Sequence, residues 1–184
     1  MKLFSKKDMG TPARALYALA VGQARRPEFY EHLGLLDTTE GRLEAVMLHV
    51  WLLLHRLKGK SDTETARLSQ TLFDVLFEDM DQSLREMGVG DMGVSRRIKA
   101  MAESFMGRIA AYDAGLTTPE NDSLEGALRR NFYRTLPGGP SPEQIGSTLA
   151  YVRTAAAALK NQPSSDFLLG KAVFPAPMGG GPSA

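Results

Sequence analysis

The chain has 184 residues, no cysteine and a formal net charge of +1 at pH 7. This length suits one domain with a real hydrophobic core, and the lack of cysteine excludes disulfides, thiolate metal sites and a cysteine nucleophile. A net charge near zero provides no global field for nucleic acid or anionic lipid, so charge-based recognition has to be local.

Helical periodicity runs through most of the chain and predicts an all-α, single-domain bundle of six to seven helices. Residues 1–11 form a basic flexible arm in this interpretation, residues 12–160 the helical domain, and residues 161–184 a tail rich in Pro, Gly and Ser. We expect residues 167–174 to pack in extended form against the bundle and residues 176–184 to be disordered.

Two helices are expected before residue 35. Pro12 suits the first turn of a helix that ends near Arg26, and Pro27 opens a short second helix. The start of the chain is basic, but its apolar run is interrupted and ends in arginines, which is not typical of a signal peptide. Because no run approaches the roughly 18 apolar residues of a membrane span, we expect a soluble, cytoplasmic protein.

The third helix, about 38–58, follows a capping-box spacing of Asp37 and Glu40. Apolar residues lie on nearly all its sides, which predicts a buried central helix. His49 and His55 do not share a face, so packed imidazoles are favoured over a metal site, and Trp51 is assigned to the core.

The fourth helix, about 62–87, is predicted to begin at a capping box of Ser61 and Glu64. Two apolar stripes imply two neighbours; one contains Phe73, Leu76, Phe77, Met80, Leu84 and Met87, the other Leu68, Leu72 and Val75. A remaining face carries Asp74, Glu78, Asp81 and Arg85. Asp79 lies nearest an apolar sector, so we expect Arg96 or Arg97 to neutralise it.

The fifth helix, about 92–116, follows a turn in which Gly88 takes the left-handed conformation, Gly90 helps to set the angle and Asp91 caps the helix. Its core stripe contains Val94, Ile98, Met101, Phe105, Ile109 and Tyr112. A second strip consists of small residues, namely Ala100, Ser104, Gly107 and Ala111. We expect a helix of the same bundle to cover this strip, the alternative being a docking groove for a partner's helix.

Two more helices are predicted towards the carboxyl end. A capping box of Asp122 and Glu125 begins a short helix, which is followed by a turn at residues 137–140. Ser141 and Gln144 form another capping box, and the last helix runs to about Lys160.

An enzyme would have to use Asp74, Glu78 and Asp81, whose carboxylates share a face as in di-metal bundles. The chain lacks the Glu-x-x-His spacing of such sites, so a solvated face is favoured, and we expect no catalysis and no cofactor. Ribosomal RNA is a second alternative, since Arg96, Arg97, Lys99 and Arg108 lie close in sequence. The aromatic residues between them belong to the core stripe, which disfavours stacking on bases.

The most informative stretch is residues 72–116. It contains Asp79, Leu84-Arg85, Met87-Gly88-Val89, Phe105, Gly107, Ala111-Tyr112-Asp113 and Leu116. In these residues it closely resembles the ubiquinol-cytochrome c chaperone family in a bacterial form, with looser similarity over residues 16–159.

The resemblance implies a helical, non-catalytic chaperone that binds newly made cytochrome b, or another component, and supports assembly of the cytochrome bc1 complex. It further implies a small helical co-chaperone, the ribosome and peripheral contact with the inner face of the cytoplasmic membrane as partners, without sequence-specific nucleic acid. We hypothesise a partner-binding surface of Asp74, Glu78, Asp79, Asp81, Arg85, Arg96, Arg97, Lys99, Ala100, Ser104, Gly107 and Ala111. The structural turn is assigned to Gly88, Gly90 and Asp91.

Overall fold

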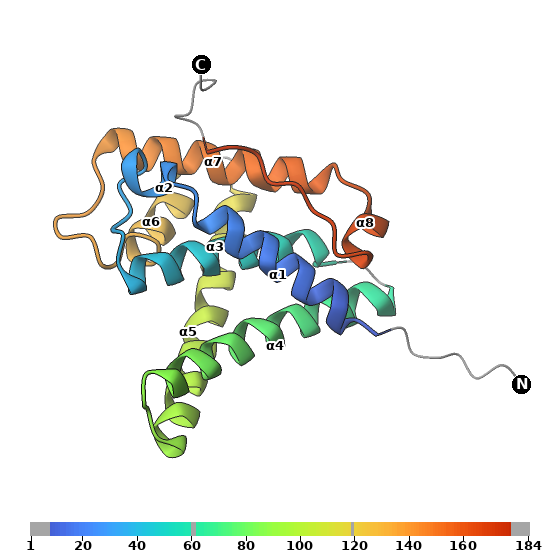
Figure 1. Ribbon diagram of the computed structural model, residues 1–184. Coiled ribbons are helices and arrows are strands. Elements are labelled where there is room, and N and C mark those ends of the chain that lie inside the picture. The colour runs from blue at the N-terminus through green and yellow to red at the C-terminus, as the bar shows by residue number, and fades with distance from the viewer. Residues whose placement is uncertain (1–7, 60–61, 119, 178–184) are drawn as a thin grey trace, which may run out of the picture.

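The structure, a computed structural model, describes residues 8–59, 62–118 and 120–177. These residues form eight helices and no strand, which confirms the all-α prediction (Figure 1). The helices are α1 (Gly10–Ala24), α2 (Glu28–Glu31), α3 (Thr39–Leu57), α4 (Thr63–Glu86), α5 (Asp91–Thr117), α6 (Asp122–Arg130), α7 (Pro142–Lys160) and α8 (Ser164–Leu168).

Helix α3 is the centre of the molecule, as its sequence predicts. It contacts α1, α4, α5 and α7, and most of its side chains from Ala45 to Leu54 are buried. Trp51 and His49 are both fully buried, so the packed-core interpretation of these two residues is confirmed. A helix that is apolar on nearly every side reaches this degree of burial only when neighbours surround it.

Helices α4 and α5 form a hairpin whose tip projects away from the other helices (Figure 1). The two helices contact each other, while α1 packs on α4, and α6 packs on the later part of α5. Phe73, Phe77 and Phe105 meet between the hairpin helices, with ring centroids 4.8 to 6.2 Å apart. Met87 departs from its predicted inward position, because it lies in the turn and is 64% exposed.

The hairpin turn is only partly as predicted. Gly88 has φ +81, the left-handed conformation expected of the residue that ends a helix. Gly90 has φ −68 and ψ 156, which any residue adopts, and it occupies the N-cap position itself. Asp91 therefore does not cap α5; it is the first residue of the helix, and its carboxylate pairs with Arg85.

The predicted helix starts differ from the observed ones by one residue in several places. The capping box at Ser141 and Gln144 is confirmed with both hydrogen bonds. At α3, Thr38 is the N-cap instead of Asp37, which pairs with Arg42. Asp62 caps α4 and Asn121 precedes α6, while Ser61 lies outside the described residues. At α3 and α4 a neighbouring polar residue caps the helix instead, whereas Asn121 makes no side-chain cap hydrogen bond at α6, so sequence spacing alone does not fix the register.

Both ends of the chain depart from prediction where the structure describes them. Helix α1 begins at Gly10 and Met9 is buried, so residues 9–11 do not belong to the flexible arm predicted for residues 1–11. In the tail, the short helix α8 replaces part of the extended segment and buries Phe167. Arg56 fixes it by donating to Ser164 and lying 4.9 Å from the centroid of Phe167. The expectation for residues 1–7 and 178–184 lies outside the described residues.

Candidate functional site

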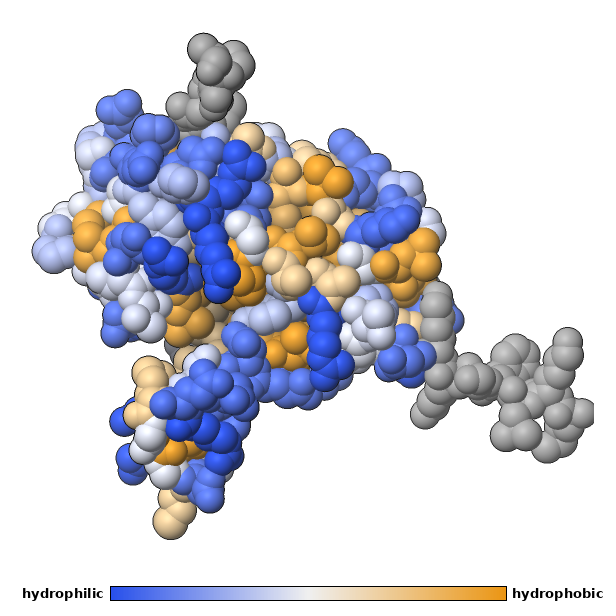
Figure 2. All heavy atoms as spheres, viewed as in Figure 1, coloured by the Kyte–Doolittle hydropathy of each residue, from blue (hydrophilic) through white to orange (hydrophobic). Residues whose placement is uncertain are grey.

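The main candidate site is a groove between helices α1 and α3 and the hairpin. It has a volume of about 460 Å³. Apolar side chains from four helices and the hairpin turn line it, namely Val21, Ala24, Leu43, Val46, Met80, Leu84, Met87 and Met101. Three of these are methionines, whose flexible side chains adapt to differently shaped apolar ligands. Figure 2 shows a mainly hydrophilic tip of the hairpin, whereas hydrophobic residues gather over the body beside it.

Asp79 is the one residue of the predicted partner-binding set that lines this groove. Its partner is Tyr17, whose hydroxyl donates to Oδ2 at 2.7 Å, so the expected neutralisation by Arg96 or Arg97 is wrong. Burial and the hydrogen bond to Asp79 raise the pKa of Tyr17, which therefore remains a donor at physiological pH. The pair places a polar group at an otherwise apolar wall.

The groove has a charged rim. Arg25, at the end of α1, and Glu40 and Arg42 of α3 line it there. Arg42 donates to Asp37 at 2.5 and 3.0 Å, and its guanidinium lies 5.7 Å from the ring centroid of Tyr30. An apolar floor with a charged rim is the usual arrangement of a surface that binds an apolar segment of another protein.

The predicted acidic face of α4 lies outside this groove. Asp74 accepts from Gln70 at 2.8 Å, and Glu78 pairs with Arg14 of α1 at 3.4 Å. Asp81 pairs with Arg85, which also reaches Asp91 across the hairpin turn. Arg85 thus links the end of α4 to the start of α5, and surface pairs of this kind contribute little to stability.

Most of the basic and small residues of α5 in the predicted set are exposed. Arg96, Arg97 and Lys99 are exposed and have no ion pair or hydrogen bond with the described residues. The small-residue strip is also exposed at Ala100, Ser104 and Gly107, and only Ala111 is partly covered. The prediction that a helix of the same bundle covers this strip is therefore wrong, because α6 reaches α5 closer to its carboxyl end, where the backbone of Leu124 approaches Gly115.

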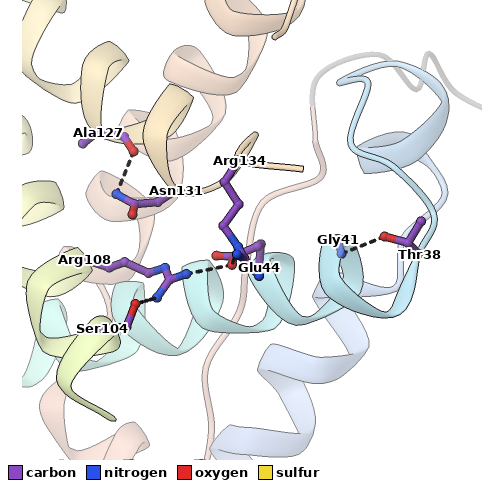
Figure 3. Close-up of polar contacts among 8 residues, drawn as sticks. All are labelled: Thr38, Gly41, Glu44, Ser104, Arg108, Ala127, Asn131 and Arg134. Atoms are coloured by element: carbon purple, nitrogen blue, oxygen red, sulfur yellow. Dashed lines mark hydrogen bonds and ion pairs between the residues drawn. The ribbon is translucent and has the colours of Figure 1, made fainter. Parts of the chain in front are cut away.

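A buried ion cluster that sequence analysis missed lies next to this strip. Glu44 of α3 is 2% exposed and accepts from Arg108 at 2.8 Å and from Arg134 at 2.5 Å, through the same oxygen. Arg108 also donates to Ser104 at 2.6 Å. Figure 3 shows both arginine side chains pointing at Glu44. The sequence contains one sign of this cluster, because Glu44 is a carboxylate within a helix that is predicted to be buried.

A second missed cluster surrounds Asp113. Its carboxylate accepts from Trp51 at 2.9 Å, His55 at 2.7 Å and Lys58 at 2.6 Å. Burial raises the pKa of Asp113, but the hydrogen bonds from Lys58, Trp51 and His55 together hold it below the ordinary value. The cluster ties the end of α3 to α5, and Asp113 belongs to the run that carries the family resemblance.

Within residues 8–59, 62–118 and 120–177, no group of three or more His, Cys, Asp or Glu side chains is arranged to hold a metal ion. None of the helices in these ranges combines the length and hydropathy needed to cross a bilayer. The carboxylates of the metal-enzyme alternative, Asp74, Glu78 and Asp81, instead interact with Gln70, Arg14 and Arg85.

Comparison with known proteins gives a consistent result. The sequence profile of the family described as ubiquinol-cytochrome C chaperone matches residues 31–174. The ubiquinol-cytochrome-c reductase complex assembly factor 1 of Xenopus laevis is 26% identical over 168 residues, which cover 90% of this chain and 81% of that protein. The mouse and human proteins of that name are 26% and 27% identical, and the match again covers 90% of this chain. The chain spans about half of their length, at 55% and 54%.

A solved structure has the same fold. The crystal structure of the Cbp3 homolog from Brucella abortus superposes with a TM-score of 0.78 at 34% sequence identity. The superposition covers 89% of this chain and 88% of the other. The arrangement of helices that forms the groove is thus shared with this protein at the level of the whole fold.

Proposed function

Because the chain belongs to the ubiquinol-cytochrome C chaperone family, we propose that it is a non-catalytic chaperone for assembly of the cytochrome bc1 complex that holds newly made cytochrome b in the groove beside Met87. The names of the relatives from mouse, frog and human support the role in assembly. The apolar groove supports the choice of client, since cytochrome b is a membrane protein whose helices are apolar.

The observation that carries the assignment of the site is the methionine-lined groove with its charged rim. Met80 and Met101 form part of its floor, and Met87 is 64% exposed at its edge. Methionine surfaces accommodate apolar helices of varied shape, and burial of apolar area provides the main free energy of binding. The Tyr17 hydroxyl and the Asp79 carboxylate add a polar contact that fixes orientation.

Two exposed methionines at the hairpin tip provide a matched test of the groove. Met87 lines it, whereas Met92, which is 90% exposed, does not. Met87→Asp is expected to weaken capture of newly made cytochrome b by about tenfold, because it places a charge against the apolar client. Met92→Asp is expected to leave capture unchanged. Equal capture by wild type, Met87→Asp and a second groove variant, Val21→Asp, would rule out the groove.

The assembly role is tested separately by deleting the coding sequence in the source organism. We expect loss of assembled, haem-loaded cytochrome bc1 complex, measured by native electrophoresis and haem spectra, and recovery with the wild-type chain. A normal amount of the complex in the deletion strain would contradict the role.

Contacts with the ribosome, with a small helical co-chaperone and with the inner face of the cytoplasmic membrane stay predictions. The unpaired Arg96, Arg97 and Lys99 are the described basic residues that suit a phosphate-bearing surface. Salt-sensitive cosedimentation with ribosomes that is lost on Arg96→Glu and Arg97→Glu would favour the RNA-binding alternative.

A further inference from the structure

Two pockets meet at the carboxyl end of α3, where His55 and Lys58 line both. Their volumes are about 450 and 600 Å³, within the usual range for sites that bind small molecules. Helix α5 contributes to both from one face, through residues three or four positions apart, namely Met106, Ile109, Asp113 and Leu116. The first three line one pocket and Leu116 lines the other, so the two pockets form one continuous furrow along α5.

The part of the furrow between α3, α4 and α5 is the apolar pocket. Its apolar side chains are Leu54, Leu57, Phe73, Met106 and Ile109. Met106 is 55% exposed, so an apolar side chain lies at the opening to solvent. Ser69 and Gln70 add polar atoms to the wall, but the Gln70 amide already donates to Asp74 at 2.8 Å. Such a pocket suits an aliphatic chain, whose burial is favourable without any hydrogen bond.

The part of the furrow between α3, α5 and α7 is the basic pocket. Its cationic side chains are Arg56, Lys58, Arg153 and Lys160. Arg56 donates to two carbonyls and a hydroxyl at the end of α7 and just beyond it, at 2.7 to 3.1 Å. Arg153 donates to three carbonyls and the Asn121 amide oxygen between the end of α5 and the start of α6, at 3.0 to 3.5 Å. All these acceptors are neutral, and the exposed Lys160 has no ion pair or hydrogen bond with the described residues.

Positive charge exceeds negative charge in the furrow. Asp113 is the one carboxylate among the described residues that line either pocket, and it already binds Lys58 at 2.6 Å. The carbonyl ends of α3, α5 and α7 add roughly half a negative charge each. Together these are smaller than the charge of the four cations, so the basic pocket complements an anionic group.

We propose that the furrow binds one molecule of an anionic phospholipid. An acyl chain lies in the apolar pocket and the phosphate lies in the basic pocket, with His55 and Lys58 beside the point where the two join. This site goes beyond the proposed client groove, and no described residue lines both. Lipid binding would bring the protein to a membrane surface and leave the groove free for a client.

Other anionic ligands complement only part of the furrow. Inorganic phosphate or a free headgroup would occupy the basic pocket and leave the apolar pocket empty. An acidic peptide or RNA would bring polar backbone groups into the apolar pocket, where burial without hydrogen bonds is unfavourable. An acyl chain brings no such groups.

The experiment titrates the full chain with three soluble probes in a calorimeter, below the critical micelle concentration of each amphiphile. Lysophosphatidylglycerol has an acyl chain and an anionic headgroup. Lysophosphatidylcholine has the same chain with a zwitterionic headgroup, and glycerol phosphate lacks the chain. We expect lysophosphatidylglycerol to bind about tenfold more tightly than either of the others. The proposal is overturned if it does not bind, or if either of the other probes binds as tightly.

One variant in each pocket, with a matched control, locates the binding site. Lys160→Glu reverses a charge of the basic pocket, and Met106→Asp places a carboxylate at the opening of the apolar pocket. Each should weaken binding of lysophosphatidylglycerol about tenfold. The controls Lys171→Glu and Met92→Asp change exposed residues that line neither pocket, and they should bind like the wild type. A test variant that binds as tightly as its control would contradict the proposal.

Met87→Asp separates this site from the client groove. It changes a residue of the groove and should leave the affinity for lysophosphatidylglycerol unchanged. Loss of lipid binding in this variant would place the lipid in the groove and overturn the furrow as its site. Capture of cytochrome b tests the groove by itself, so failure of lipid binding leaves the proposed function intact.

Discussion

Glu44 and Arg108 lie 64 residues apart in sequence and form an ion pair of 2.8 Å with side chains that are 1% and 8% exposed. The pair joins the central helix α3 to the hairpin helix α5. Arg134 reaches the same Glu44 oxygen from just beyond α6, so three segments converge on one carboxylate. Removing one partner of a buried pair is more destabilising than the pair's net contribution, because the other charge stays buried.

Arg108→Ala is therefore expected to reduce the free energy of unfolding by about 3 kcal/mol. Arg134→Ala should reduce it by about 1 kcal/mol, because that side chain is 45% exposed and solvent screens its pairing with Glu44. Urea unfolding followed by fluorescence of the single tryptophan, Trp51, measures both. Arg130→Ala, an exposed position on α6, serves as the control and should have no effect. An Arg108→Ala loss no larger than the Arg134→Ala loss would contradict a structural role for the buried pair.

Because His49 is buried, we expect the free energy of unfolding to depend on pH. Complete burial lowers its pKa from 6.5 to about 4, outweighing the hydrogen bond with Ala45. Between these values the unfolded chain binds a proton that the folded chain does not, so stability decreases as pH falls from about 6.5 towards 4. The full effect is about 3 kcal/mol at 1.36 kcal/mol per pKa unit.

His49→Gln removes the titrating group and should flatten this part of the curve. The measurement is urea unfolding at several pH values between 4.5 and 7.5. Unchanged stability of the wild type across that range would show that His49 accepts a proton in the folded state.

Two glycines of α5 should respond in opposite directions to the same substitution. Gly115→Ala would place a β-carbon 2.6 Å from Leu124 Cα, so α6 must move and stability should fall by about 1 to 3 kcal/mol. Gly107→Ala meets open space and should raise stability by about 0.5 to 1 kcal/mol. Thermal unfolding of the two variants is the measurement. A loss of stability at Gly107 would show that the bundle covers the strip.

The hairpin turn allows a comparison of two glycines two residues apart. Gly88→Ser should reduce the free energy of unfolding by about 1 kcal/mol, because φ is +81 and an L side chain is strained there. Gly90→Ser should be neutral or slightly stabilising, since its φ of −68 suits any residue and serine is a good N-cap. Equal melting temperatures of the two variants would contradict the left-handed conformation of Gly88.

The acidic face of α4 is proposed to assist binding through charge, since it lies outside the groove. Reversal of Asp74, Glu78 and Asp81 to Lys should slow capture of cytochrome b a few-fold at low salt, and the difference should shrink as salt is added. Association rates at several salt concentrations measure this. Unchanged capture by the folded variant would remove the acidic face from the partner-binding surface.

Most of the helices, the core and the family are predicted correctly from the order of amino acids alone. Apolar residues at helical spacing lie on the faces that pack against neighbouring helices and so leave water, and Phe77, Phe105 and Tyr112 are buried as predicted. Local turn chemistry likewise predicted the left-handed conformation of Gly88 and the N-cap at Ser141, and both are observed. The resemblance to the family lies mainly in residues 72–116. The match of the family's sequence profile to residues 31–174 confirms it.

Which surfaces remain open and which polar groups meet depends on how the helices pack against one another. Periodicity shows that the small-residue strip of α5 forms one face, but whether a helix covers it depends on where α6 turns back. In the same way, Tyr17 with Asp79 and Glu44 with Arg108 join residues 62 and 64 positions apart. Such pairs depend on how whole helices pack, and no local spacing encodes that packing.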